Sequence, residues 1–335
     1  MEPGAQPQLF QPRTVPLALR ARVEKELEKL HVVEEKVIEP VQSSEWAAHI
    51  VPVFRSIRIC GDYKVTVNKF AKTEQYPLPR IEDLFAALSG GQAFTKLDLA
   101  NAYLQLPLED KYNRLPFGVA SAPTVFQRTI ESLLQGIQHV VVYIDDILIT
   151  GESEQEHLKN LDEVLKRLEA AGLRLKAEKC KFIKAEVEYL GHRISKEGIY
   201  TTSAKVTAIK NAPVPTDVQQ LRSFLGAVNY YGKFLPNLSS KLAPLHSLLE
   251  NGKPWQWLDI HQKAFDCAQL RLISSQVLTH FDSKKEMILS CDASPYGVGA
   301  VLEHRFPDSS ERPIAFASRT LAPAEGTTPN LIRRD

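Results

Sequence analysis

Three aspartates have the spacing and surroundings of a hard-metal site. Asp145 and Asp146 are adjacent and lie between two runs of β-branched and aliphatic residues, 140–142 and 147–149. A buried carboxylate without a partner is costly, so we expect this pair at the tip of a hairpin, exposed or neutralised by cations. Asp98 also ends an apolar strand-like run, and acids at the ends of neighbouring strands would converge. Oxygen ligands without His or Cys select Mg²⁺ or Mn²⁺, and two such ions suit in-line phosphoryl transfer. An ordinary Asp-Asp hairpin turn without metal remains the alternative.

Composition limits the classes of protein that the chain can belong to. Its 335 residues suit two or three domains, and 44% hydrophobic with 24% charged residues excludes a disordered or collagen-like chain. A net charge of +1 argues against a wholly basic nucleic-acid coat protein. We find no apolar run of membrane-spanning length and no signal-peptide core, and expect a cytoplasmic or nuclear location without a membrane partner. The four isolated cysteines are interpreted as reduced core thiols.

Hydrophobic periodicity alternates between helical and strand-like stretches, which indicates a mixed α+β fold. Residues 1–15 carry three prolines and no periodicity, and are predicted to form a loose arm. The expected helices are 17–30, 80–88, 122–134, 154–171 and 217–234, and the expected strands are 49–54, 57–60, 93–99 and 140–150. Asp217 is a good N-cap for the last of these helices. A final αβ block opens near Lys284.

Several ordered motifs resemble those of a known family. Leu97-Asp98-Leu99 with Tyr103, the segment 115–123 with Phe126-Gln127, and Tyr143-Ile-Asp-Asp146 look like successive polymerase motifs of a reverse transcriptase. The segments 59–63, 76–80, 189–192 and 221–231 are similar to the pol polyprotein of gypsy-type long-terminal-repeat retrotransposons. The resemblance implies an α+β right-hand polymerase with fingers, palm and thumb, followed by a connection domain and a truncated RNase H-like α/β domain.

The domain ranges implied by the resemblance divide the chain into six parts. They are a flexible arm (1–15), shortened fingers with the palm (16–150), a thumb with a primer-holding hairpin (151–203), the connection (204–283), a partial RNase H-like domain (284–325) and a tail (326–335).

Catalytic and metal-binding roles follow from the resemblance residue by residue. Asp98 and Asp145 would hold two Mg²⁺ or Mn²⁺ ions, with Asp146 as a weaker or more distant carboxylate ligand. Asp292 would be the first metal ligand of the RNase H-like domain.

The nucleotide-binding residues implied by the resemblance surround Asp98. Tyr103 would be a steric gate against the ribose 2′-hydroxyl, although a plain packing role is the alternative. Instead of binding the nucleotide, Phe117 could simply pack in the core. Arg58 could likewise be an ordinary exposed residue of a strand. Lys179 could also act as general acid to the pyrophosphate. The full set is Arg58, Asn101, Ala102, Tyr103, Phe117, Gly118, Gln127 (as a buttress of the helix behind) and Lys179.

Primer and template contacts are expected from a hairpin and a basic stretch. The stretch from Lys166 to Lys184 contains seven basic and two acidic residues, a local net charge of +5. Such a charge suits the phosphates of a duplex, although a run of this kind can also be an ordinary solvated surface. The expected primer and template residues are Tyr143, Lys166, Arg167, Arg174, Lys176, Tyr189, Leu190, Gly191 and His192.

The chain departs from the family pattern in two places. The fingers are shortened, because only six residues separate Leu108 from Leu115 and only Arg55-Ser56 join two strand-like runs without a turn residue. After Glu325 the similarity stops, and residues 326–335 can be written as a family-like continuation read one base out of frame. We therefore hypothesise a one-base deletion, which sequencing the gene would test, and expect RNase H activity to be lost.

Three functions remain open from the sequence. The first is an RNA-directed DNA polymerase acting on deoxynucleotides and a primed RNA or DNA template. The second is an inactive, decayed copy of the element, and the third is a nucleic-acid-binding protein without catalysis. Neither the oligomeric state nor the template can be deduced from the sequence.

Overall fold

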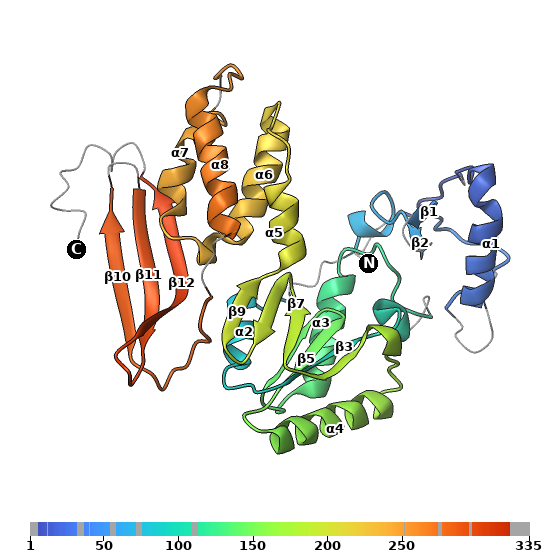
Figure 1. The fold of residues 1–335 in the computed structure, drawn as a ribbon. Coiled ribbons are helices and arrows are strands. Elements are labelled where there is room, and N and C mark those ends of the chain that lie inside the picture. Colours follow the sequence, from blue (N-terminus) through green and yellow to red (C-terminus); the bar gives the residue numbers. More distant parts are fainter. Residues whose placement is uncertain are drawn as a thin grey trace. The chain divides into compact units, whose positions relative to one another are not determined.

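The computed structural model describes residues 6–11, 13–31, 37–39, 41–53, 58–71, 76–108, 113–250, 252–273, 277–294 and 297–321, and for His31, Pro52, Val53 and Arg58 it describes the backbone alone. The chain divides into two compact units. The first comprises residues 1–80, 95–149 and 158–182, and the second comprises 81–94, 150–157 and 183–335. The mixture of helices and strands confirms the α+β class (Figure 1).

A four-stranded sheet carries the three aspartates. Its strand order is β4-β5-β3-β6, with β3 at Phe94–Asp98, β4 at Val140–Tyr143, β5 at Asp146–Ile149 and β6 at Lys181–Lys184. Strands β3 and β5 are antiparallel, and their register places Asp98 opposite Asp146. The expected convergence of the two strand ends is therefore confirmed.

Two amphipathic helices cover this sheet. Helix α3 (Ala122–Leu134) has the predicted bounds, and α4 (Glu154–Ala170) ends one residue before its predicted end. Phe126 and Ile130 of α3, one helical turn apart, are fully buried, as is Val164 of α4. They share one core with Leu97 of β3 and further residues of β5.

The described residues before 80 contribute a helix and a two-stranded sheet to the first unit. Helix α1 (Leu17–His31) is followed by antiparallel β1 (Ile50–Val53) and β2 (Arg58–Gly61). The two strands pair although the sequence lacks a turn residue, and their connection, 54–57, lies outside the described residues. Across the described residues of the first unit as a whole, short 3₁₀ helices lie at Val67–Lys69, Ala102–Gln105 and Ala177–Lys179.

The predicted loose arm is partly wrong. Ala47 donates its N–H to the Gln8 carbonyl at 2.9 Å and accepts from the Phe10 N–H at 3.2 Å, and the Phe10 ring lies 5.6 Å from that of His49. Backbone pairing of this kind needs no periodic pattern, so composition could not reveal it.

The second unit begins with a helix and a three-stranded sheet. Helix α2 spans Ile81–Ala87, within the predicted range. The sheet has the order β7-β8-β9, with β7 at Glu186–Tyr189, β8 at His192–Ser195 and β9 at Gly198–Thr201. Helix α5 (Ser203–Lys210) leads to α6 (Val218–Tyr230), and the predicted single helix to Phe234 instead breaks into a 3₁₀ turn at Gly232–Phe234. The Asp217 carboxylate accepts the Gln220 N–H at 2.8 Å, so the predicted N-cap is confirmed.

The remainder of the second unit packs helices against another sheet. Helix α7 (Leu238–Ser247) lies beside α8 (Asp259–Ile273) and contacts β11 and β12. The antiparallel sheet β10-β11-β12 consists of Met287–Ala293, Gly297–Arg305 and Glu311–Thr320 (Figure 1). Within the described part of 284–321 only strands occur, whereas we expected a block of both helix and strand.

No helix among the described residues has the length and apolarity needed to span a membrane. None of the four cysteines, all of which the structure describes, forms a disulfide. Cys291 is exposed, so its interpretation as a core thiol is wrong.

Candidate active site

Asp145 and Asp146 lie where the sequence predicts them, at the tip of a hairpin. Tyr143 and Asp146 face each other at the ends of β4 and β5, so Ile144 and Asp145 make the turn. Ile144 has φ 55°, a left-handed conformation that is rare for a β-branched residue and costs about 1–3 kcal/mol. The Leu99 N–H donates to the Asp145 carbonyl at 3.2 Å, which attaches the turn to the end of β3. We call residues 140–149 the aspartate hairpin.

Gln127 holds the strained turn from behind. Its side chain is fully buried in α3; Oε1 accepts the Ile144 N–H at 2.6 Å, and Nε2 donates to the Val142 carbonyl at 2.9 Å. Nε2 also donates to Glu131 at 2.7 Å. Gln127 thus buttresses the aspartate hairpin from α3, whereas we expected it to buttress the helix behind the nucleotide site; its contribution to nucleotide binding stays a prediction.

The carboxylates of Asp98 and Asp145 line one cavity of about 300 Å³, which we call the aspartate cavity. Asp146 does not line it. Its carboxylate instead pairs with the Lys96 ammonium of β3 at 2.9 Å. Burial raises the pKa of Asp146, Lys96 opposes the rise, and the charges of Asp145 and Asp98 add to it. The three acids are therefore near enough to repel one another.

The donor set partly fits the expected metal ions. Asp98 and Asp145 offer the oxygen ligands that Mg²⁺ and Mn²⁺ prefer. In the described part of the chain, however, no three acidic, His or Cys side chains are grouped so that they could share one ion. A lysine stands beside Asp98 and another beside Asp146, so ammonium groups now neutralise two of the three carboxylates.

Most of the expected nucleotide-binding residues surround the aspartate cavity. Asn101, Ala102, Tyr103 and Phe117 all line it. The Tyr103 ring lies 5.2 Å from that of Phe117 and 5.4 Å from that of Phe126, so the gate and packing roles are compatible. Burial and then the charge of Asp145 raise the pKa of the Tyr103 hydroxyl.

Gly118 supports the cavity wall without lining it. Its φ of 98° favours glycine, and a Cβ there would come within 2.7 Å of the Gly61 carbonyl oxygen. The Asn68 amide donates to the Gly118 carbonyl and accepts the Ala120 N–H, both at 2.9 Å. The Arg58 side chain lies outside the described residues.

Two lysines provide the positive charge of the aspartate cavity. Lys179 Nζ lies 3.1 Å and 3.3 Å from the two carboxylate oxygens of Asp98. Lys176, which we expected at the primer or template, lines the same cavity. Both reach it from the segment that follows α4.

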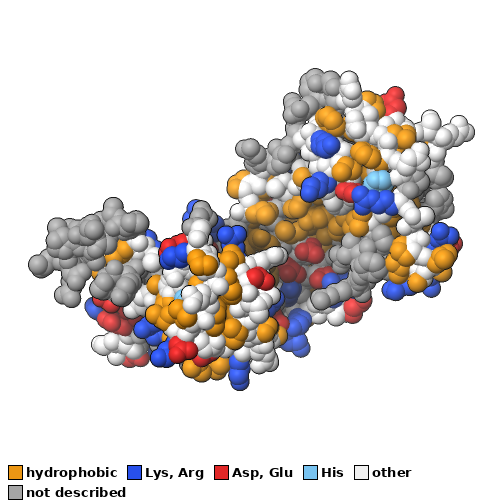
Figure 2. Space-filling view, turned by 90° about the horizontal axis from the view of Figure 1, so that it is seen from above, with side chains coloured by type: hydrophobic (Ala, Val, Ile, Leu, Met, Phe, Trp, Pro, Cys, Tyr) orange, Lys and Arg blue, Asp and Glu red, His pale blue; other side chains and the backbone are white. Residues whose placement is uncertain are grey.

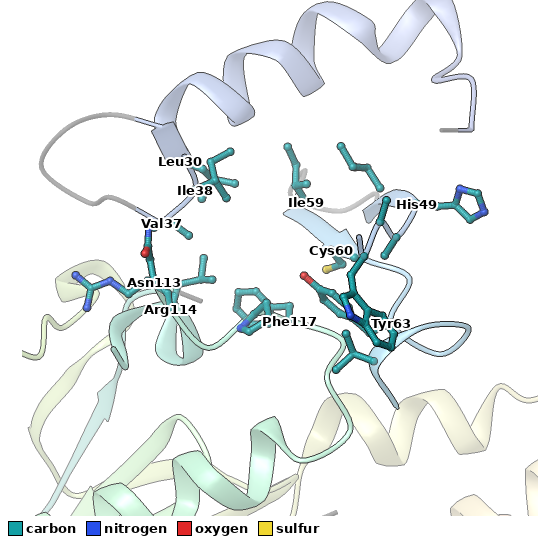
Figure 3. Close-up of a pocket in the computed structure, with 18 of the residues that line it drawn as sticks. Leu30, Val37, Ile38, His49, Ile59, Cys60, Tyr63, Asn113, Arg114 and Phe117 are labelled. Atoms are coloured by element: carbon teal, nitrogen blue, oxygen red, sulfur yellow. The ribbon is translucent and has the colours of Figure 1, made fainter. Parts of the chain in front are cut away.

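A second, larger cavity of about 400 Å³ adjoins Phe117 in the first unit. Figure 3 shows labelled side chains from the end of α1, from 37–38, from His49, from β2 with Tyr63 just after it, and from the segment 113–117. Leu30, Ile38 and Ile59 give it a largely apolar lining. Phe117 lines both cavities, so it separates an apolar space from a charged one.

The basic stretch is less positive than its count suggests. Lys166 pairs with Asp162 at 2.6 Å, and Arg167 pairs with Glu163 at 2.7 Å. Arg167 also donates to the carbonyls of Leu133 and Gln135 at the end of α3, so its guanidinium has a structural role. The charge count in the sequence analysis started at Lys166 and therefore left out Asp162 and Glu163, which lie one helical turn earlier. Figure 2 shows basic and acidic side chains interspersed on the face in view.

The remaining primer and template candidates differ in exposure. Arg174 is exposed, and Tyr143 is half-buried at the end of β4. In the second unit, Tyr189 and His192 are both 1% exposed, so their side chains cannot meet a primer directly. Leu190 and Gly191 form the turn between β7 and β8, with φ 46° and 69°, and are the half-buried part of this motif.

Asp292, the expected metal ligand of the RNase H-like domain, is exposed on β10.

Two residues that the sequence analysis missed support this site. Lys96 is two positions before Asp98, so strand periodicity places both on one face of β3 and could have revealed it. Asn68 is far from residues 118–120 in the sequence, and no local pattern indicates its contacts.

Two models of known protein families match separate segments of the chain. The family model described as reverse transcriptase (RNA-dependent DNA polymerase) matches residues 110–194, and the model described as an RNase H-like domain found in reverse transcriptase matches 257–333. The second match begins inside the stretch that we assigned to the connection and reaches into the tail. The domain limits and the frameshift stay predictions.

Relatives and solved structures extend the similarity beyond these two segments. The Tf2-3 and Tf2-7 transposon polyproteins of Schizosaccharomyces pombe are each 35% identical over 287 residues, covering 81% of this chain and 22% of the relative. The chain thus spans about a fifth of their length. A foamy viral protease-reverse transcriptase in complex with dsDNA has TM-score 0.87 at 25% identity, covering 98% of this chain and 72% of that one. The same viral protein in complex with an RNA/DNA hybrid has TM-score 0.82 at 25% identity, covering 98% of this chain and 46% of that one. Motifs, fold and relatives therefore agree: the chain carries a segment matched by the reverse transcriptase family and another matched by the RNase H-like domain found in reverse transcriptases, and it is similar to retrotransposon polyproteins of the gypsy type.

Proposed function

We propose that the chain is an RNA-directed DNA polymerase that adds deoxynucleotides to a primer paired with an RNA or DNA template. The observation that carries this proposal is the aspartate cavity, where carboxylates from two neighbouring strands meet an aromatic pair and two lysines. The similarity to viral reverse transcriptases in complex with dsDNA and with an RNA/DNA hybrid supports the same substrates.

Asp98 and Asp145 are the proposed ligands of two divalent ions, Mg²⁺ or Mn²⁺. Such ions would activate the primer 3′-hydroxyl and neutralise the leaving pyrophosphate. Lys179 must first leave Asp98, because its ammonium lies within 3.3 Å of both carboxylate oxygens. Once released, Lys179 would still line the aspartate cavity, where it could donate a proton to the leaving pyrophosphate.

Asp146 has a supporting role in this proposal. Its ion pair with Lys96 keeps the carboxylate turned toward β3 while Asp98 and Asp145 face the cavity. The charge of Lys96 reduces the repulsion that the three carboxylates exert on one another. The Tyr103 ring lies tilted beside that of Phe117 on the cavity wall, and Tyr103 is the proposed gate that excludes a ribose 2′-hydroxyl.

Primer extension on an RNA template in the presence of Mg²⁺ tests the proposal. We expect the wild-type chain to lengthen a labelled DNA primer. Asp145→Asn should reduce the rate about 100-fold or more, because it replaces a charged carboxylate ligand of the proposed divalent ions by a neutral amide. Asp162→Asn is the matched control: it removes an exposed acid from α4 whose pair with Lys166 is worth only a few tenths of a kcal/mol.

Binding without catalysis is the second candidate function. It is favoured by the ammonium groups at Asp98 and Asp146 and by the absence of a three-ligand group among the described residues. A chain that binds a primed hybrid but does not extend the primer in either Mg²⁺ or Mn²⁺ would establish this candidate and refute the first.

The same reaction, run with a labelled RNA template, reports on RNase H activity. Asp292 is exposed on β10, and no three-ligand group accompanies it in the described part of the second unit. One carboxylate cannot hold two ions, so a polypeptide of these 335 residues is proposed to copy the RNA without nicking it.

A further inference from the structure

The turn between β7 and β8 has an uncommon backbone conformation. Leu190 and Gly191 both have positive φ, as two-residue hairpin turns require. Glycine adopts this conformation without strain, whereas leucine does so only when its surroundings hold it there. The neighbouring α6 supplies those surroundings.

Two adjacent tyrosines of the second unit bind the carbonyl groups of this turn. The Tyr230 hydroxyl donates to the Leu190 carbonyl at 2.6 Å, and the Tyr231 hydroxyl donates to the Gly191 carbonyl at 2.9 Å. Both hydroxyls are also within 3.5 Å of the position that a Cβ on Gly191 would occupy. One helix end therefore fixes both peptide groups of the turn.

His192 provides a third hydrogen-bond donor to the carbonyl groups of the turn. Its Nδ1 lies 2.7 Å from the Leu190 carbonyl, and its ring is enclosed by Phe85, Tyr230, Tyr231 and Phe234 with centroids 5.0–5.7 Å away. Burial lowers the pKa of His192 to about 4, so the ring is neutral near pH 7 and Nδ1 carries the donated proton. The Leu190 carbonyl thus accepts from two side chains.

The geometry points to Tyr230 and Tyr231 as positioning residues for the primer: their hydroxyls set the shape of the 190–191 turn against which the primer end is held. This inference rests on the proposed polymerase function and on the expected role of the hairpin 189–192. It differs from the expectation for that hairpin, because Tyr189 and His192 are buried and the turn backbone, fixed by α6, is what remains for a nucleic acid to meet.

Hydroxyl deletion tests the inference with little change in shape. We compare Tyr230→Phe, Tyr231→Phe and the double variant with wild type for KM of the primed template, KM of the deoxynucleotide and kcat. A neutral hydrogen bond contributes about 1 kcal/mol, so each deletion is expected to raise KM of the primed template about fivefold, with KM of the deoxynucleotide unchanged. Tyr200→Phe is the matched control, because Tyr200 lies in the same sheet and contacts Arg193 through its ring face.

A structural role alone predicts a different result. In that case the variants would melt at lower temperature but keep wild-type kinetics well below the melting temperature, and the inference would be overturned. Tyr230 is 44% exposed, so its variant is expected to fold even if Tyr231→Phe does not.

Fluorescence anisotropy of a recessed primed duplex, without deoxynucleotide, separates this inference from the proposed polymerase function. If wild type binds but does not extend, the polymerase proposal fails and the binding constants still decide the inference. Equal binding by wild type and the double variant would refute it.

Discussion

Replacing Gln127 by leucine tests whether α3 holds the aspartate hairpin in its active shape. The amide of Gln127 satisfies the Ile144 N–H and the Val142 carbonyl, and the side chain is fully buried. Leucine has a similar volume but no polar atom, so both backbone groups would lose their partner inside the protein. An unsatisfied buried group costs about 1–3 kcal/mol, which gives about 3 kcal/mol for the two after partial relaxation.

The strain at Ile144 makes the effect on activity larger than the effect on stability. Its φ of 55° persists because the Gln127 amide and the strand pairing hold the turn. Without the amide the turn can relax and move Asp145, the next residue, away from the cavity. We therefore expect primer extension to fall at least tenfold at a temperature where the variant is still folded.

Thermal unfolding and primer extension of the same preparations make the test. A loss of about 3 kcal/mol corresponds to a decrease of roughly 6–12 °C in the melting temperature for a unit of this size. Thr129→Ala, on the same helix, is the control, because the Thr129 hydroxyl bonds only to the Val125 carbonyl within α3. A decrease below about 2 °C together with wild-type extension would refute the reasoning.

Two further predictions concern specificity and pH. Tyr103→Val should lower the preference for deoxyribonucleotides over ribonucleotides about tenfold or more, since it opens the space beside Phe117, whereas Tyr103→Phe should keep that preference; competing kcat/KM values measure it. His192 has a pKa of about 4 in the fold and about 6.5 when unfolded, so the unfolded chain binds the extra proton and stability is lost as pH falls from 6.5 to 4. Between pH 7.5 and pH 4.5 the loss is about 2.5 kcal/mol, and His192→Asn should remove it from the difference between urea unfolding at these two pH values. An unchanged pH difference in the variant would contradict the assignment.

Local sequence determined the elements and the position of the aspartates. The apolar period of 122–134 specifies α3 because side chains three and four residues apart share one helix face. Two strand-like runs around Asp145 and Asp146 specify a hairpin, because burying either carboxylate inside a strand is costly. The motifs that resemble reverse transcriptases added expected roles for individual residues, which periodicity alone does not suggest.

Tertiary structure decided which side chain serves which purpose. Gln127 turns out to hold the hairpin, Lys96 to neutralise Asp146, Arg167 to bind the end of α3, and the 230–231 tyrosines to fix a distant turn. Each of these contacts depends on direction and on a distance of about 3 Å, and most join residues far apart in the chain. Hydrophobic patterns report only which face of an element is buried, so they cannot distinguish a polar side chain that meets a substrate from one that meets a backbone carbonyl.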